Sequence, residues 1–303
     1  MKAKPGIGRR RWIGAALATA GLGLLPAGRR AAAADGFQAV PKHLQVLRTA
    51  PASWPQVVEL SRRMGIGAVA LSIPPEDRKR FLADNPAGIA AFEPFRRAGL
   101  DVRCMIGDAE WVRDRPDALP LELIELLHVH ERVFRFKGLL LDVQPQTLPD
   151  WKTERAALVR GTLSLYATAH AACKVRQLSF AAALAPWYVA TPDPDRRGAS
   201  FFDSSLRRMD EALVMAYRND PDKAIALAQG ALAALERRPI PYWFGVSTQP
   251  GNAPGSSYHG LGLARFQHDL VALRERLEDS PGRPQFAGIA IHQFATLRAL
   301  ANA

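Results

Sequence analysis

The sequence predicts an α/β protein built as a single (β/α)8 TIM barrel, in which eight strand–helix units close on themselves. Strand-like and helix-like segments alternate from about residue 40 to the end of the chain. The run Gly-Leu-Leu-Leu-Asp-Val-Gln-Pro at residues 138–145 is apolar up to its acid, as in a parallel strand buried on both faces. No Gly-x-Gly-x-x-Gly or Walker loop follows a strand, which weakens the main competitor, an open nucleotide-binding sheet.

The first half of the chain predicts four strands, each an apolar run stopped by polar residues, glycine or proline. These strands are expected at residues 40–47, 66–73, 100–106 and 138–143. Apolar residues at helical spacing lie between them and predict helices at residues 55–64, 86–98 and 120–133. Asn85 suits the N-cap of the second helix, and Gly99 suits its C-terminal end.

The second half repeats the alternation. Strands are expected at residues 178–184, 211–217, 242–246 and 286–291. Helices are expected at residues 153–172, 203–209, 221–237, 263–277 and 296–301. Asp220 is a suitable cap for the helix that Pro221 begins. Two loops rich in Pro and Gly, after the fifth and seventh strands, would lie on the face of the barrel that carries active sites.

Residues 1–34 have the three-part pattern of an export signal. A basic start ends in Arg9, Arg10 and Arg11, a weakly apolar region follows at residues 13–25, and four alanines occupy residues 31–34. Paired arginines before such a region indicate the twin-arginine route, and therefore a periplasmic or secreted protein. Residues 35–303 would then form the barrel domain. The alternative is an uncleaved membrane tether.

The net charge of +11 belongs largely to this segment. Residues 1–34 hold seven basic residues and no acid, so the remainder has 33 basic against 29 acidic residues, a net charge of +4. Such a charge predicts no nucleic-acid partner. No later segment approaches the roughly 20 apolar residues that cross a bilayer, so no membrane span is expected after signal cleavage.

The predicted strand ends supply a candidate site. Asp142 and Gln144 lie two residues apart and would point the same way, since strand side chains alternate. The alternative is an Asp that caps the next turn and a Gln that bonds a loop. Other strand ends add Glu110, Trp111, Trp187, Tyr217, Arg218 and His292. Carboxylates, amides and aromatic rings around one mouth are typical of a carbohydrate site, although each ring could instead pack the barrel rim.

Metal and cofactor signals are weak. Cys104 and Cys173 are expected to be core residues, because two cysteines make neither a disulfide framework nor a zinc site. His128 and His130 are two apart on a predicted helix, so they face different ways and form no metal pair. The sequence therefore predicts neither a metal nor a cofactor.

Three short motifs resemble the chitinase-like glycoside hydrolase superfamily of barrels. Leu-Asp-Val-Gln-Pro at residues 141–145 resembles its fourth-strand D-x-E motif. Val-Met-Ala-Tyr at residues 214–217 is similar to its sixth-strand M-x-Y motif. Gly-Ile-Ala-Ile-His at residues 288–292 is similar to the last strand of exported bacterial proteins of that superfamily. The resemblance implies an exported barrel that acts on glycans.

The departures from that pattern bear on activity. Gly138 and Leu140 stand where the motif has further acids, Arg218 follows the tyrosine in place of Asp, and Gln144 replaces the Glu that serves as general acid. A neutral amide has no proton to give near pH 7, so Gln144 can hold a sugar hydroxyl but cannot protonate a leaving oxygen. We expect Asp142 to support this position.

Two functions follow. The first is a glycoside-hydrolase-like barrel that binds, or acts weakly on, a polysaccharide or cell-envelope glycan. The alternative is an active glycosidase that uses Asp142 with a carboxylate from another strand, such as Glu110, since glycosidic cleavage normally needs two carboxyl groups. A lyase or isomerase on the same barrel is a more distant possibility. The sequence leaves open whether the protein is an enzyme.

Overall fold

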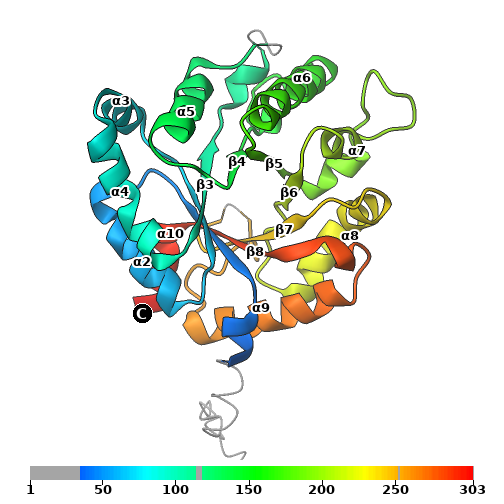
Figure 1. Cartoon of the computed structure of the whole chain (residues 1–303). Helices are drawn as coiled ribbons and strands as arrows, with labels where there is room; N and C mark the ends of the chain where they lie inside the picture. The colour runs from blue at the N-terminus through cyan, green and yellow to red at the C-terminus, as the bar shows by residue number, and fades with distance from the viewer. Residues whose placement is uncertain (1–34, 114–117, 252, 303) are drawn as a thin grey trace, which may run out of the picture.

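The structure is a computed structural model that describes residues 35–113, 118–251 and 253–302. Eight parallel strands close into a barrel in chain order, and the last strand pairs with the first (Figure 1). The strands are β1 (Lys42–Val46), β2 (Ala68–Leu71), β3 (Asp101–Ile106), β4 (Gly138–Leu141), β5 (Ser179–Leu184), β6 (Glu211–Val214), β7 (Tyr242–Ser247) and β8 (Phe286–His292). The predicted (β/α)8 barrel is confirmed, and the open sheet is excluded.

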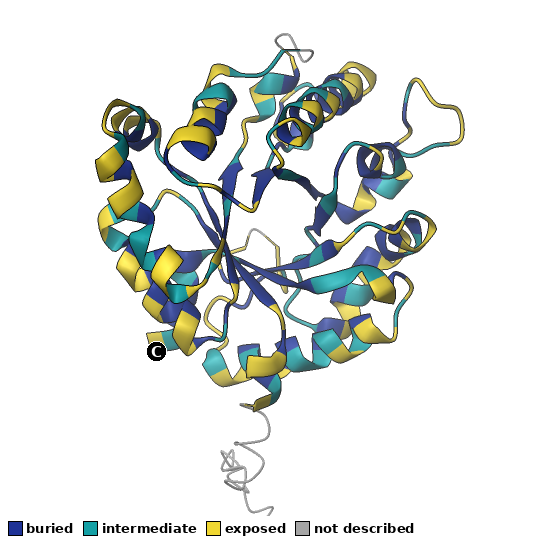
Figure 2. Ribbon diagram, viewed as in Figure 1, coloured by how far each residue is buried: buried dark blue, intermediate teal, exposed yellow. Residues whose placement is uncertain are grey.

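Helices surround the barrel and present buried faces to it and exposed faces outward (Figure 2). They are α2 (Trp54–Arg63), α3 (Pro75–Ala83), α4 (Asn85–Ala98), α5 (Leu121–Arg132), α6 (Arg155–Lys174), α7 (Phe201–Leu206), α8 (Pro221–Arg237), α9 (Leu263–Glu278) and α10 (Phe294–Asn302). Within the described part of the chain, no helix combines the length and the apolar character that a membrane crossing requires. Cys104 and Cys173 are buried and free, as expected of core residues.

Several element boundaries differ from expectation. The first strand begins at Lys42 and not at residue 40, because residues 40 and 41 join it to a helical segment at residues 35–39. Helix α3 was not predicted, because a proline after a strand indicates the end of that strand, but proline also suits the first position of a helix. Helix α4 is capped by Asp84, whose side chain accepts a hydrogen bond from the Ala87 N–H at 3.1 Å, and not by Asn85. The sixth strand ends at Val214, which frees residues 215–217 for the barrel mouth.

A polar layer closes the barrel interior at the amino-terminal ends of the strands. Glu211 at the start of β6 accepts hydrogen bonds from Arg103 at 2.8 Å, from Ser179 at 2.7 Å and from Trp243 at 3.2 Å. Above this layer lies a small apolar cluster of Ala70, Met105, Leu140, Ala181, Ala183, Leu213 and Ala290. Among the described residues, both layers lie inside the barrel, below the carboxyl-terminal ends of the strands.

Candidate functional site

A cavity of about 620 Å³ opens at the carboxyl-terminal ends of the strands. Its walls come from the ends of β3 and β8 and from the segments that follow β1, β2, β3, β4, β7 and β8. The lining residues are Leu47, Arg48, Ser72, Met105, Ile106, Gly107, Asp142, Gln249, His292 and Gln293. This is the position of active sites in barrels of this kind.

Asp142 reaches the cavity because the strand pattern aims it there. Leu140 points into the barrel, and side-chain alternation gives Asp142 the same direction one step beyond the end of β4. Gly107 lets the end of β3 approach closely, since a Cβ at that position would lie 2.1 Å from the Asp142 carbonyl oxygen. Any larger residue at position 107 would therefore push the two strand ends apart.

The Asp142 carboxyl group is held by an amide. Gln144 Nε2 donates a hydrogen bond to Asp142 Oδ1 at 2.9 Å. Burial raises the pKa of Asp142, while the bond from Gln144 and the nearby His292 act in the opposite direction. Burial is the largest of these effects, so the carboxyl group retains a proton more readily than an exposed Asp would.

Gln144 is itself fixed by a chain of polar side chains. Its Oε1 accepts from Gln146 Nε2 at 3.2 Å, and the Tyr188 hydroxyl donates to Gln146 Oε1. The Thr147 hydroxyl also donates to the Gln144 carbonyl oxygen at 2.8 Å. Both ends of the Gln144 amide are thus engaged, so its NH2 group is directed at Asp142. Gln144 does not itself line the cavity.

His292 stands between two amides. Its Nδ1 lies 2.7 Å from Gln45 Oε1, and its Nε2 lies 2.8 Å from Gln249 Oε1. Burial lowers the pKa of His292, and the charge of Asp142 only partly offsets that effect. A neutral imidazole has a single N–H donor, so in that state it can donate to one of these two amide oxygens at a time.

Tyr217 completes the group around Asp142. Its ring centroid lies 5.8 Å from that of His292. The pKa of the Tyr217 hydroxyl is raised by burial and, to a smaller extent, by the negative charge of Asp142. Gly245 leaves room for the ring, because a Cβ there would lie 3.0 Å from Tyr217 Cε1. Asp142, Gln144, Tyr217 and His292 therefore lie together at the carboxyl-terminal ends of the strands, and of these four Asp142 and His292 line the cavity.

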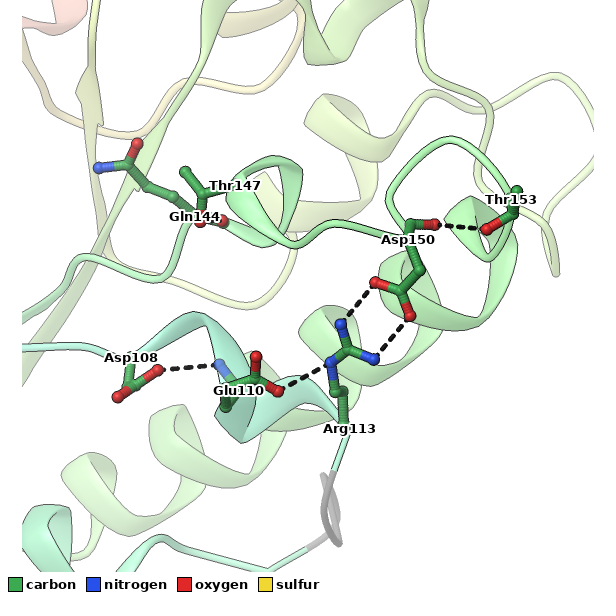
Figure 3. Close-up of polar contacts among 7 residues, drawn as sticks. All are labelled: Asp108, Glu110, Arg113, Gln144, Thr147, Asp150 and Thr153. Carbon is green, nitrogen blue, oxygen red and sulfur yellow. Dashed lines mark hydrogen bonds and ion pairs between the residues drawn. The ribbon is translucent and has the colours of Figure 1, made fainter.

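The remaining predicted residues lie elsewhere. The Glu110 side chain is 60% exposed and pairs with Arg113 at 2.8 Å, while Arg113 also bonds Asp150 (Figure 3). Glu110 and Trp111 line a separate hollow beside α5. The structure does not bring Glu110 to the cavity that Asp142 lines, because the helical turn after β3 directs it toward Arg113.

Trp187 and Arg218 also lie outside the cavity lining. The Trp187 ring is 42% exposed and packs edge-on against Tyr188, with centroids 4.7 Å apart. It therefore belongs to the barrel rim, the alternative that the sequence left open for each aromatic residue. Arg218 donates to the Tyr217 carbonyl oxygen at 2.8 Å and so braces the segment that carries Tyr217.

Sequence reasoning missed the contribution of the first two strands. Gln45 bonds His292, while Arg48 and Ser72 line the cavity. A buried Gln within a predicted strand was an available signal. Arg48 and Ser72 gave none, since a cation after a strand and a serine within one are common on surfaces.

The cavity has one acidic group and a polar lining. Asp142 is the single carboxylate among the described residues that line it. Among the residues that the structure describes, no three His, Cys, Asp or Glu side chains are grouped as a metal ion would require. The site can thus hold polar ligands through amide, hydroxyl and imidazole groups and can use one carboxyl group.

No protein-family model matches the chain, and no curated protein matches it. Among solved structures, a mutant class V chitinase from Nicotiana tobaccum in complex with NAG4 is 12% identical, with a TM-score of 0.51, over 85% of this chain and 94% of that one. A protein assigned as an α-L-fucosidase from Bacteroides thetaiotaomicron is 11% identical, with a TM-score of 0.51, over 84% and 85% of the two chains.

The same fold also occurs in another reaction class. A protein assigned as a deoxyribose-phosphate aldolase from Toxoplasma gondii is 10% identical, with a TM-score of 0.54, over 90% of this chain and 94% of that one. Identities this low establish the fold alone, because one barrel fold hosts many unrelated functions. The chain is a (β/α)8 barrel similar in fold to chitinases and to other barrel enzymes.

Proposed function

We propose that the barrel binds a polysaccharide or cell-envelope glycan in the cavity above Asp142 and cleaves it weakly or not at all. The observation that carries this proposal is the Asp142–Gln144 hydrogen bond of 2.9 Å, in a cavity whose described lining has no second carboxylate. Glycoside hydrolysis normally needs one carboxyl group to protonate the leaving oxygen and another on the opposite side of the bond. Here an amide stands beside the single acid.

The polar groups suit a sugar. Asp142 and the amides of Gln249 and Gln293 offer both donors and acceptors to hydroxyl groups. The fold similarity to a chitinase in complex with NAG4 adds to this argument, although that ligand belongs to the other protein. The alternative, an active glycosidase with Glu110 as second acid, receives no support from geometry, since Glu110 is exposed and paired with Arg113.

A glycan array followed by calorimetry tests this proposal. The mature protein should bind one class of oligosaccharide, and Asp142→Ala should weaken that binding because it removes a hydrogen-bonding group from the cavity. Asp101→Ala is the matched control, since Asp101 is an exposed acid at the opposite end of the barrel. Efficient glycan turnover by the wild-type protein, or binding that is unaffected by Asp142→Ala, would contradict the proposal.

A further inference from the structure

One wall of the cavity carries polar side chains that have no protein partner. Arg48, Ser72 and Gln293 line the cavity, yet none of their side chains is hydrogen-bonded or ion-paired to any residue that the structure describes. By contrast, Asp142, Gln249 and His292 are bonded to protein groups. The unpaired groups are therefore concentrated on one side of the cavity, where they are available to a ligand.

The strand register gathers these three residues. β1 lies between β2 and β8, with Val46 opposite Leu71 and Gln45 opposite His292. Ser72 and Gln293 each lie one residue beyond those partners, and Arg48 lies two residues beyond Val46. Because parallel strands end at the same edge, their side chains form one continuous wall.

This wall is positively charged. Arg48 is the single cationic side chain among the described lining residues, and no described carboxylate lies within ion-pair distance of it. Asp142 is the single lining acid, and burial raises its pKa, which reduces its negative charge. The Arg48 backbone has a φ of +47°, a conformation that arginine rarely adopts and that concentrates at functional sites.

We propose that Arg48, with Ser72 and Gln293, binds the carboxylate of an acidic sugar residue, so that the glycan is a uronic-acid polymer. This proposal rests on the proposed function and names its substrate class. The planar guanidinium group of arginine matches a carboxylate through two parallel hydrogen bonds. The serine hydroxyl and the glutamine NH2 group are further donors, and the wall offers no anion to repel the ligand. Arg48 is thus a specificity-determining residue.

The test compares two ligands that differ only in the carboxylate. These are a tetrasaccharide containing glucuronic acid and the same tetrasaccharide after its carboxyl groups have been reduced to alcohols. Calorimetry should give binding of the acidic form about tenfold tighter or more, since hydrogen bonds to a charged group stabilise more than neutral ones. The preference should shrink at high salt.

Variants then locate the effect. Arg48→Gln, which removes the charge and replaces the guanidinium group with a shorter neutral amide, should abolish the preference and leave binding of the reduced form almost unchanged. Arg48→Lys should keep part of the preference, because it keeps the charge and loses the planar fork. Arg132→Ala is the control, since Arg132 is exposed at the end of α5 and lies outside the cavity. Thermal unfolding checks that each variant is folded.

The outcomes separate the two proposals. Equal binding of both ligands by the wild-type protein overturns the acidic-sugar proposal and leaves the glycan-binding proposal standing. If Arg48→Gln weakens binding of both tetrasaccharides equally, the acidic-sugar proposal is also overturned, because Arg48 would then not distinguish a carboxylate from an alcohol. Binding of neither ligand, together with an empty glycan array, overturns both proposals.

Discussion

The Asp142–Gln144 contact decides what chemistry is open to the cavity. Replacing Gln144 with Glu would set two carboxyl groups at hydrogen-bonding distance, where they cannot both ionise easily and would share a proton. That proton could pass to a leaving oxygen, and general acid catalysis contributes about 10²- to 10⁴-fold. We therefore expect Gln144→Glu to raise the hydrolysis rate of the bound glycan, as measured by product chromatography.

The control for that experiment is Gln146→Glu, which adds a carboxyl group to the same polar chain one step farther from Asp142. It should leave the rate unchanged. If Gln144→Glu hydrolyses the glycan no faster than the wild-type protein, then the amide is not what limits turnover.

Asp142 also has a predictable effect on stability. Its folded-state pKa is raised by burial, so the folded protein holds a proton that the unfolded chain releases from about pH 3.8 upward. The protonated Asp142 therefore stabilises the folded state at low pH, and this stabilisation is lost as the pH rises from 3.8 through the higher pKa of the folded state. Asp142→Asn removes the charge and keeps an oxygen for Gln144, so it should raise the melting temperature at pH 7.

The same comparison at acid pH supplies the check on mechanism. The gain should shrink as the pH is lowered through 3.8, because below that value the wild-type carboxyl group is protonated in both states. If Asp142→Asn is no more stable than wild type at pH 7, or if its gain in stability does not depend on pH, then burial of the Asp142 charge does not destabilise the folded protein.

At the scale of elements, strand β1 carries a buried histidine, His43, whose ionisation should affect stability as that of Asp142 does. His43 is 2% exposed, neither ring nitrogen has a partner among the described residues, and its ring lies 5.3 Å from Trp243. Burial lowers the pKa of His43 to about 3, and the positive charge of Arg103 lowers it further. The unfolded chain takes up a proton below about pH 6.5 while the folded barrel does not, so stability falls as pH decreases through this window.

We expect wild type to lose about 2 to 3 kcal/mol more unfolding free energy than His43→Leu between pH 7 and about pH 4.5. Denaturant titrations at both pH values measure this difference. His128→Gln is the matched control, because His128 lies on the exposed face of α5, outside the barrel interior. Equal pH dependence in wild type and His43→Leu would mean that His43 is protonated inside the barrel.

The elements were largely predictable, and the reason is hydrophobic periodicity. Strands such as β4 and β5 are short apolar runs, and their short length between helical patterns indicates strands. Helix α3 escaped prediction because the Pro74–Pro75 pair both stops a strand and starts a helix. The cap at Asp84 was assigned to its neighbour Asn85, since both residue types cap helices and only the local backbone decides between them.

The site was predictable only in part. Asp142 and His292 follow from the rule that barrel chemistry lies at strand ends. The orientation of a turn after a strand does not follow from it, which is why Glu110 faces Arg113 and Trp187 lies on the rim. Arg48 and Ser72 needed the register between β1, β2 and β8, a property of the closed sheet that no local pattern encodes.

At the scale of the whole molecule, residues 1–34 remain to be placed, because they lie outside the described residues. We propose that they direct folded protein through the twin-arginine route and are cleaved near Ala34, since Arg9, Arg10 and Arg11 precede a weakly apolar region. Replacing these three arginines with lysines should trap the precursor in the cytoplasm. Cell fractionation measures this, and normal export of the variant would count against the route.

The barrel as a whole places the candidate site at one end. Among the described residues, the polar layer around Glu211 and the apolar cluster above it lie inside the barrel, while the opposite end is open above Asp142. A glycan in that opening would meet Asp142 at the end of β4, and it would meet His292 beside the unpaired wall of Arg48, Ser72 and Gln293. The central claim is that this opening holds a glycan without cutting it.

A crystal structure of the wild-type protein, kept for days with the tetrasaccharide that binds most tightly in the glycan array, tests this claim most directly. It measures both where the sugar lies and whether it is intact. We predict an uncut tetrasaccharide in the cavity, with a hydroxyl group within hydrogen-bonding distance of Asp142. Cleaved products in the cavity, or an intact sugar bound elsewhere on the barrel, would contradict the account.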